Sequence, residues 1–321
     1  MKSKSKAALA LVLAMGLSLT ACARQDRRTE SEPQPTQAAS MDILPYSNAA
    51  GTDARNLTLY FGYGQEDCLV PVSRQVEVSA DERVEKALIE EMIKGPADSD
   101  SLDLTPLINP ETQVVSVSNR SGYLFITLSQ EFLNAPVEIP KGMEEDVAWQ
   151  EQVNRVRRLS VDALVNAITE LGAYTHIYLL VDDGTGQGVR ILREQVGYLV
   201  NGQLPLEPMV RNANIILTPF RLVQLVMEAM SAKQWQSMSR LIAWDGAAQD
   251  LSSKLLQQTV LQYHVDGEHV SEDGQSAVVT LAVTLKNADG VETQATAPMR
   301  CRRVAGVWKL EQSALAHLGW Q

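Results

Sequence analysis

The sequence predicts an α+β protein with two folded parts, residues 55–212 and 213–321. In the first part, segments that alternate apolar and polar residues are interleaved with segments of helical periodicity. In the second part, helical segments come first and strand-like segments separated by turn signals follow. Residues 23–54 are polar and contain prolines, so they lack the apolar content to build a core. These patterns predict two domains that follow a flexible tether.

The first folded part opens with two extended segments and a helix. Residues 57–61 begin with alternating apolar and polar residues, and residues 69–78 carry valines around a proline. Asp81 is the expected N-cap of a helix that runs to Lys94, because apolar residues then recur at spacing three and four. The Gly-Pro pair at 95–96 ends this helix.

A hairpin, a long helix and a last strand complete the first part. Residues 115–128 predict a hairpin that turns at 119–122. An apolar stripe predicts a helix over 145–171 with Gly172 as its C-cap, and residues 177–181 predict a core strand. The order is two strands, a helix, two strands, a helix and a strand. It predicts a sandwich with helices on one sheet face.

Residues 57–205 resemble the GerMN domain of sporulation and germination lipoproteins. The resemblance is carried by Leu-Tyr-Phe at 59–61, Leu-Val-Pro-Val at 69–72, Lys-Gly-Pro at 94–96 and Ser-Gln-Glu-Phe at 129–132, in that order. It implies a non-catalytic domain similar to the ring-building motifs of secretion machines, which assemble side by side. The stretch 136–147 departs from the family pattern as an insert.

The second folded part predicts helices at 220–232 and 235–242 and then a curved antiparallel sheet. Asp-Gly pairs at 266–267, 273–274 and 289–290, with Ala-Gly at 305–306, are the expected hairpin turns. The late strand Gly-Val-Trp-Lys-Leu at 306–310 completes a pattern that resembles the nuclear-transport-factor-2-like (cystatin-like) cone. In that fold the cone holds a ligand or an active site, or serves only for association.

The N-terminus predicts an exported protein with a lipid anchor. Three lysines precede an apolar run at 7–15, which is too short to span a bilayer. The run ends in Leu-Thr-Ala-Cys at 19–22, which resembles the lipobox of bacterial lipoproteins. The resemblance implies that Cys22 carries a diacylglycerol and acyl chains such as palmitate, which hold the chain on the outer face of the cytoplasmic membrane. The alternative is an ordinary signal peptide in which Cys22 has no role.

Charge and cysteine content narrow the function classes. The formal net charge is −11, and removal of residues 1–21 takes away three lysines and no acidic residue. An acidic chain argues against nucleic acid as a partner, because that binding needs Lys and Arg to neutralise phosphates. Two further cysteines, Cys68 and Cys301, are either a disulfide or two buried free thiols.

A search for catalytic and metal-binding patterns finds none, so we expect no catalytic residue, cofactor or metal site and no enzyme activity. The Gly-rich loop 182–188 lacks the Lys-Ser/Thr of a phosphate-binding loop. The acidic run 98–103 lacks the glycine and glutamate of a calcium loop. The glutamate pairs at 90–91 and 144–145 diverge on a helix. The histidines form no zinc or nucleophile motif; they are His176, His264, His269 and His317.

The leading hypothesis is therefore a structural lipoprotein of the cell envelope that acts in sporulation or germination. It would work through self-association or contact with envelope proteins. One alternative is an extracytoplasmic ligand-binding module, with a pocket in the second part lined by Trp235, Trp244 and Trp308. A less favoured alternative is a hydrolase that acts on wall material.

Overall fold

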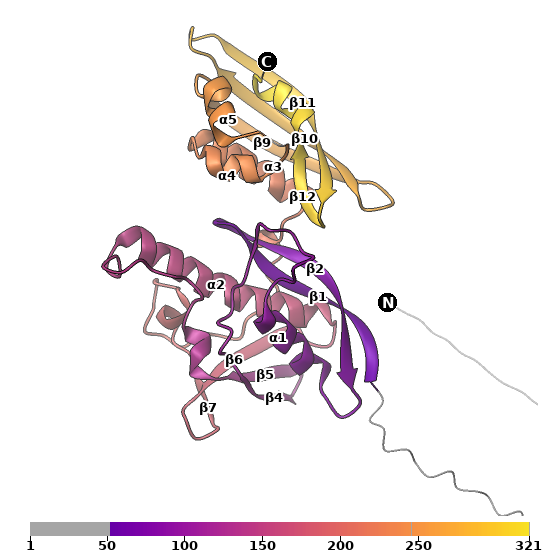
Figure 1. Cartoon of the computed structure of the whole chain (residues 1–321), viewed down its shortest axis with the longest axis vertical. Coiled ribbons are helices and arrows are strands. Elements are labelled where there is room, and N and C mark those ends of the chain that lie inside the picture. Colours follow the sequence, from indigo (N-terminus) through magenta and orange to yellow (C-terminus); the bar gives the residue numbers. More distant parts are fainter. Residues whose placement is uncertain (1–51, 245, 321) are drawn as a thin grey trace, which may run out of the picture. The chain divides into compact units, whose positions relative to one another are not determined.

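The computed structural model describes residues 52–244 and 246–320 (Figure 1). The signal segment and Cys22 lie outside the described residues. The first strand, β1, already begins at Thr52, inside the segment predicted as tether. None of the helices in the described part of the chain is long and apolar enough to cross a membrane.

The first sheet has three strands in the order β2-β1-β3. The strands β1 (Thr52–Tyr63) and β2 (Glu66–Ser79) form a long antiparallel hairpin, and the short β3 (Leu104–Thr105) pairs with the end of β1. Pro71 lies in β2, an edge strand, where its missing N–H interrupts no ladder inside the sheet.

The second sheet has four strands in the order β4-β5-β6-β7. They are β4 (Val114–Arg120), β5 (Tyr123–Leu128), β6 (His176–Asp182) and β7 (Gly188–Arg190). The β4–β5 hairpin turns at Ser121 and Gly122, both with positive φ, within the predicted turn. β5 and β6 are parallel, which requires a crossover connection. The strands of the first part thus form two sheets.

The helices of this part are α1 (Val84–Lys94) and α2 (Val147–Glu170), with 3₁₀ turns at Gln130–Leu133, Arg193–Val196 and Ala213–Ile215. The prediction of Asp81 as the N-cap is wrong, because α1 begins three residues later and its N-cap position is Arg83, which makes no side-chain capping bond. Asp146 caps α2 by accepting hydrogen bonds from the backbone N–H groups of Ala148 and Trp149. α2 packs on β1 and β2, and α1 packs on β1, β2 and β4.

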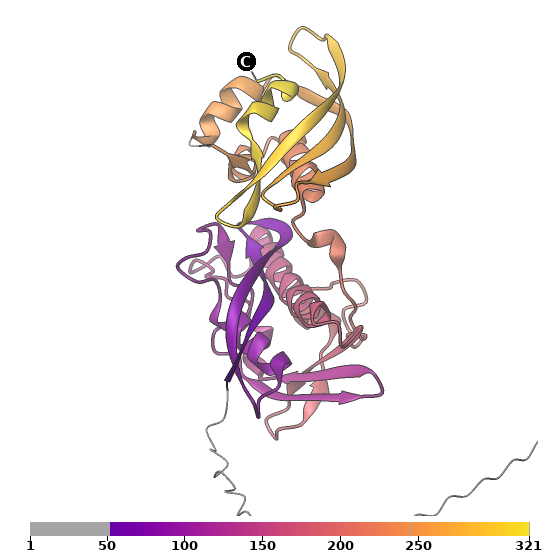
Figure 2. The same ribbon diagram turned by 90° about the vertical axis from the view of Figure 1, so that its right-hand side faces the viewer.

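The second part begins with α3 (Pro219–Ser231) and α4 (Trp235–Arg240). A five-stranded sheet in the order β8-β12-β11-β10-β9 follows. Its strands are β8 (Ile242–Ala243), β9 (Thr259–Val270), β10 (Ser276–Lys286), β11 (Glu292–Val304) and β12 (Val307–Glu311). The helix α5 (Ala248–Leu255) and a final 3₁₀ turn (Gln312–Leu318) were not predicted. Figure 2 shows the long strands curving past α3. The α+β class and the helices-then-sheet order are confirmed.

Three of the four predicted hairpin turns in this sheet are confirmed, and the one at Asp266-Gly267 is wrong. β9 runs through both residues, and the pairing with β10 shifts register there. The extra residue is accommodated as a bulge, for which glycine is suited. An Asp-Gly pair in a strand therefore produced a bulge where the pattern predicted a turn.

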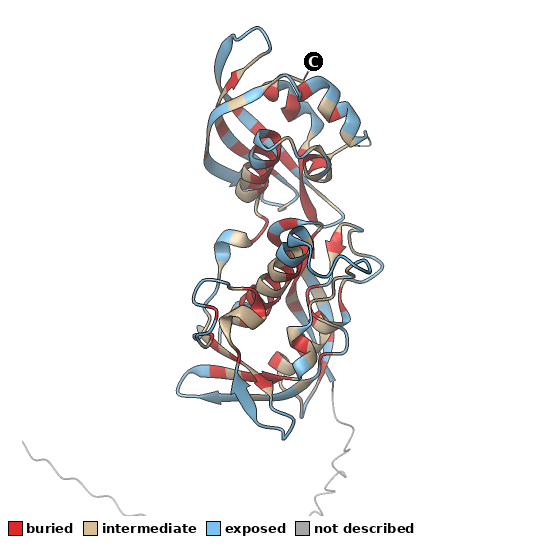
Figure 3. Cartoon of the chain, turned by 90° about the vertical axis from the view of Figure 1, so that its left-hand side faces the viewer, coloured by how far each residue is buried: buried red, intermediate tan, exposed pale blue. Residues whose placement is uncertain are grey.

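The interior of the second part is filled by its own side chains. On β10 buried and exposed residues alternate, and the buried set includes Val279 and Leu281. α3 packs against β9, β10 and β12, and its Met227 and Met230 are fully buried. Figure 3 shows buried residues on the helices and strands of this part. Apolar side chains thus fill the space between α3 and the sheet.

Two buried polar residues of α2, Asp162 and Asn166, bind Asn212 in the segment that leads into α3. Asn166 is fully buried; its amide donates to the Asn212 carbonyl at 2.9 Å and accepts from the Asn212 N–H at 2.8 Å. Asp162, one turn earlier, accepts from the Asn212 side chain at 3.5 Å. The pair of backbone bonds fixes the path of the chain between the two folded parts.

Replacing Asp162 by asparagine tests the cost of its charge. Burial raises the pKa of Asp162 from 3.8 to about 6, and the Asn212 hydrogen bond opposes this rise. Above about pH 6 the folded protein holds a buried carboxylate that the unfolded chain exposes to water, so the free energy of unfolding falls as the pH rises from about 4 to about 6. The difference between the pKa of Asp162 in the folded and in the unfolded protein corresponds to at most about 3 kcal/mol of unfolding free energy.

We therefore expect Asp162→Asn to raise the free energy of unfolding by about 1–3 kcal/mol at pH 7.5 and to change it little near pH 4. Urea unfolding at a series of pH values measures this. A difference that stays constant across the series would contradict a titration of Asp162.

Candidate functional site

The histidines singled out in the sequence do not converge. His176 begins β6, and His317 lies exposed in the last 3₁₀ turn. His264 and His269 pair with Ala282 and Val278 on β10, so they lie about 13 Å apart along the sheet. A single metal ion, with bonds to nitrogen of about 2 Å, cannot bridge that distance. In the described ranges no cluster of three or more His, Cys, Asp or Glu side chains could hold a metal ion.

The loop 182–188 connects β6 and β7 and is stabilised by its own carboxylates. Asp183 accepts from the N–H and the hydroxyl of Thr185, and Asp182 accepts from the N–H of Gly186 at 2.8 Å. Two carboxylates therefore occupy the donors that a phosphate would need.

The acidic run 98–103 is likewise engaged in structural contacts. Asp100 accepts from Arg74 at 2.9 Å and from the N–H of Ala97, and Asp103 forms an ion pair with Lys309. These carboxylates meet cationic side chains of the protein itself.

The three tryptophans proposed to line a pocket have separate surroundings. Trp308 on β12 is buried and lies under the guanidinium of Arg303. Trp235 lies beside the ammonium of Lys233. The ring of Trp244 meets that of Trp320 edge to face, with 5.4 Å between the ring centroids. Each ring is used in packing or in a cation contact.

Both cysteines inside the described range are buried free thiols. Burial raises the pKa of Cys68 and of Cys301 to about 12. Thiols of this kind hold little thiolate at neutral pH and are poor nucleophiles.

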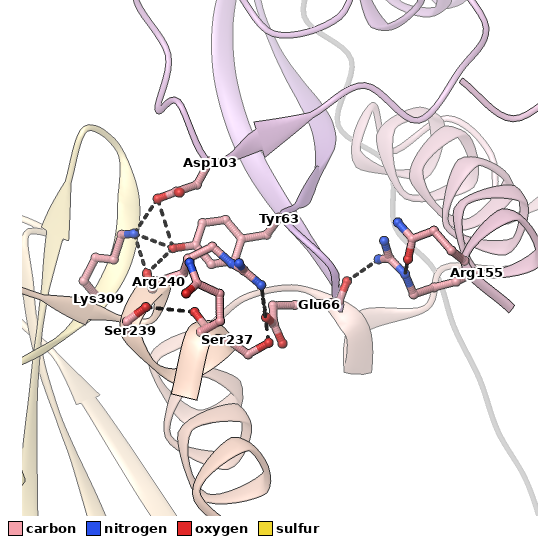
Figure 4. Close-up of polar contacts among 10 residues, drawn as sticks. Tyr63, Glu66, Asp103, Arg155, Ser237, Ser239, Arg240 and Lys309 are labelled. Atoms are coloured by element: carbon pink, nitrogen blue, oxygen red, sulfur yellow. Dashed lines mark hydrogen bonds and ion pairs between the residues drawn. The ribbon is translucent and has the colours of Figure 1, made fainter. Parts of the chain in front are cut away.

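The residues that the structure does bring together form a polar cluster that the sequence did not predict (Figure 4). We define the polar junction as Tyr63 at the end of β1, Glu66 at the start of β2, Asp103 before β3, Arg240 at the end of α4 and Lys309 in β12. It joins the first folded part to the second across as many as 246 positions of the chain.

Local structure brings these groups into range. β3 pairs with Gly62 and Tyr63, and the N–H of Gly64 donates to the Asp103 carbonyl at 2.9 Å, so Asp103 lies beside Tyr63. Gly64 has φ +52°, and a Cβ there would lie 2.8 Å from Nε of Arg240. The positive φ therefore favours glycine, and a side chain at this position would also displace the Arg240 side chain.

Lys309 lies at the centre of the junction and is buried, with 7 % of its surface exposed. Its ammonium has three N–H donors. They bond to Asp103 Oδ2 at 2.8 Å, to the Arg240 carbonyl at 2.5 Å and to the Tyr63 hydroxyl. A buried ammonium is costly unless paired and fully hydrogen-bonded, and here both conditions are met.

Tyr63 completes this arrangement as acceptor and donor. Its hydroxyl accepts from Lys309 and donates to the Arg240 carbonyl, which also accepts from Lys309. Burial, together with the charge of Asp103, raises the pKa of Tyr63 far above its ordinary value. The hydroxyl therefore keeps its proton and stays a donor at physiological pH.

Glu66 connects α4 and α2 at the junction. Its carboxylate forms an ion pair with Arg240 at 3.3 Å, and its carbonyl accepts from Arg155 of α2 at 2.6 Å. The Nε of Arg240 is buried and has no acceptor among the described residues. The donors of Lys309 are all used within the protein, so the geometry is that of a contact between folded parts.

Sequence reasoning missed the junction for a simple reason. Lys309 stands in the apolar run Val-Trp-Lys-Leu, where a single charge in a strand normally faces solvent. Its apolar neighbours, Trp308 and Leu310, give no further signal, because a strand with an outward-facing lysine has the same pattern.

We expect Tyr63→Phe to lower the free energy of unfolding by about 1–2 kcal/mol. The change keeps the ring but removes one acceptor of Lys309 and one donor to Arg240. Tyr123→Phe is the control, since Tyr123 lies exposed on another sheet. Chemical denaturation measures both, and equal effects would show that the Tyr63 hydroxyl adds nothing.

Comparison with known proteins places the first part of the chain. Residues 58–186 match the sequence model of the Germane family, described as sporulation and spore germination. No curated protein matches the chain.

Solved structures give distant similarities. The tandem GerMN domains of the sporulation protein GerM from Bacillus subtilis share 16 % identity, cover 53 % of this chain and 51 % of theirs, and give a TM-score of 0.33. The first of those domains shares 13 % identity, covers 50 % of this chain and 98 % of its own, and gives a TM-score of 0.31. A candidate lipoprotein from Clostridium perfringens shares 24 % identity, covers 40 % of this chain and 76 % of its own, and gives a TM-score of 0.23. The chain spans about half the length of the tandem-domain structure.

TM-scores this low carry no weight, so the assignment stands on the sequence model. The matched residues run from β1 to the loop after β6 and include both helices of the first part. They agree with the resemblance found in the sequence. The chain therefore carries a GerMN domain of the Germane family over residues 58–186.

Proposed function

We propose that this protein is a non-catalytic lipoprotein of the cell envelope that acts by assembly in sporulation or spore germination. The observation that carries the proposal is the match of residues 58–186 to the Germane family, described as sporulation and spore germination. The lipobox-like sequence that ends at Cys22 supports attachment to the outer face of the cytoplasmic membrane.

The internal structure supports a role in assembly. The polar junction and the Asn166–Asn212 bonds hold β1, α2, α4 and β12 in defined contact. A protein whose two parts are fixed in this way presents its surfaces in one arrangement, which lowers the entropic cost of association. The partners would be further copies of the chain or other envelope proteins.

Assembly is tested by the size of the protein in solution. We expect the full chain, purified in detergent, to form oligomers in a concentration-dependent manner, alone or with envelope proteins of the source cell. Sedimentation or light scattering measures this. A chain that stays monomeric at every concentration and with every envelope partner would overturn the assembly role.

The anchor is tested in the cell. We expect Cys22→Ala to abolish labelling by a radioactive fatty acid and to release the exported chain from the membrane fraction, since the variant has no thiol for the diacylglycerol. Deletion of the gene is expected to lower spore yield or germination, and the variant to restore it only in part. Full complementation by an exported, folded variant would show that the lipid is dispensable.

A further inference from the structure

A loop of the first folded part exposes three aliphatic side chains that the proposed function does not use. We define the apolar loop as residues 192–205, which follow β7 and begin with the 3₁₀ turn Arg193–Val196. In this loop Leu199 is 69 % exposed, Val200 is 77 % exposed and Leu204 is 56 % exposed. A single exposed aliphatic residue is common on a protein surface, but three in one short loop indicate a surface that meets something apolar.

The base of the apolar loop is fixed on α2. Arg158 of α2 donates to the Gly197 carbonyl at 3.0 Å. Gly197 has φ +80°, and a Cβ there would lie 2.2 Å from the Asn154 carbonyl oxygen, so the loop backbone lies directly on the helix. The guanidinium of Arg193 lies over the Tyr198 ring, 5.1 Å from its centroid. The exposed side chains therefore belong to a loop that is anchored to a long helix.

Carbonyl groups beside the exposed side chains are bonded within the loop. Two N–H groups of Arg193 and one each of Glu194 and Leu204 donate to them, at distances between 2.9 and 3.2 Å. The four accepting carbonyls belong to Val200, Asn201, Gly202 and Leu204. A carbonyl group is costly to take out of water unless it keeps a hydrogen bond. These four carbonyls keep theirs wherever the loop is placed, so they can leave water at low cost.

The apolar loop is electrically neutral on an acidic chain. Residues 192–205 contain one arginine and one glutamate, whereas the whole chain has 39 acidic residues against 28 lysines and arginines. The Glu194 carboxylate accepts from Gln203 at 2.6 Å. Just outside the two ends of the loop, Arg190 and Glu207 approach each other to 3.9 Å. The loop itself therefore adds no repulsion from an anionic lipid surface.

The chain that precedes the described residues indicates what lies near this loop. Residues 23–51 connect the proposed lipid anchor at Cys22 to Thr52, where β1 begins. A tether of this length spans about 30 Å on average, so the anchor keeps the folded part close to the bilayer. Attachment makes any further contact with lipid intramolecular, and a small apolar contact then suffices to hold the loop there.

From these observations we propose that the apolar loop inserts Leu199, Val200 and Leu204 into the lipid interface of the bilayer to which the chain is anchored. The aliphatic side chains enter the boundary between headgroups and acyl chains, and the internally bonded carbonyls follow them. A protein partner fits less well, because a stable protein interface buries about 800 Å² per partner, more than three aliphatic side chains supply. The inference rests on the anchor of the proposed function and adds which side of the GerMN domain faces the lipid.

The test places an environment-sensitive label in the loop. Val200→Cys is labelled with the fluorophore NBD, and the full chain is reconstituted into phosphatidylcholine vesicles with or without phosphatidylglycerol. Cys68 and Cys301 are buried, so the label reacts at the introduced cysteine. Compared with the labelled Cys22→Ala chain in buffer, we expect NBD emission to rise and to shift to shorter wavelength. Lipids brominated in their acyl chains should quench it, equally in both vesicle types because the loop is neutral.

Val291→Cys is the matched control for the label. Val291 is a valine with 57 % exposure in the turn between β10 and β11 of the second part. In the same vesicles its NBD emission is expected to remain that of a label in water, without quenching by brominated lipid.

The affinity of the loop itself is measured on the Cys22→Ala chain, which has no anchor. Leu199→Ser in this chain is expected to lower its partition into vesicles about tenfold, because one leucine side chain no longer leaves water. Leu256→Ser is the control, since Leu256 is 55 % exposed at the end of α5, and we expect no change. Co-sedimentation with vesicles measures the partition, and thermal unfolding confirms that each variant is folded.

Several results would overturn the proposal. They are an NBD label at position 200 that stays in water while the chain floats with the vesicles, equal signals from positions 200 and 291, and equal effects of Leu199→Ser and Leu256→Ser. An NBD shift that grows with the concentration of the Cys22→Ala chain in lipid-free buffer would identify the loop as a contact between copies and would also overturn it. A full chain that does not float with the vesicles would contradict the anchor, and the partition of the Cys22→Ala chain then decides on the loop.

Discussion

A single buried ammonium group organises the contact between the two folded parts. Lys309 comes from the second part, while two of its three acceptors, Asp103 and Tyr63, come from the first, and the third is the Arg240 carbonyl at the end of α4. An ammonium group in this position tolerates no partial arrangement, because each unpaired donor would carry the desolvation cost of a buried charge. The positions of β3, the Gly64 turn and the end of α4 are therefore linked requirements.

The same requirement explains the composition around the junction. Gly64 leaves room for the Arg240 side chain, and Arg240 in turn meets Glu66 at 3.3 Å. The hydroxyl of Tyr63 remains protonated because burial and the Asp103 charge both raise its pKa. Asp162 of α2, by contrast, has a pKa that burial raises to about 6, so its carboxyl group titrates close to neutrality.

Much of the fold followed from periodicity and turn chemistry. The pattern of Leu124, Ile126 and Leu128 predicted β5, and the stripe of α2 predicted that helix to within two residues at its start. The errors arose where tertiary contacts override local signals. Asp266-Gly267 reads as a turn but forms a bulge because β9 continues to pair with β10. The junction could not be predicted, since no local pattern states which carbonyl, carboxylate or hydroxyl will face a lysine that lies 69, 206 or 246 positions away.

The long separation along the chain between Tyr63 and Lys309 has a kinetic consequence. Closing a loop of this length costs conformational entropy before its bonds form, so the junction belongs to the late steps of folding. Interactions absent from the folding transition state act on the rate of unfolding and leave the rate of folding nearly unchanged. The junction would then lengthen the lifetime of the native state, because it slows the separation of the two parts during unfolding.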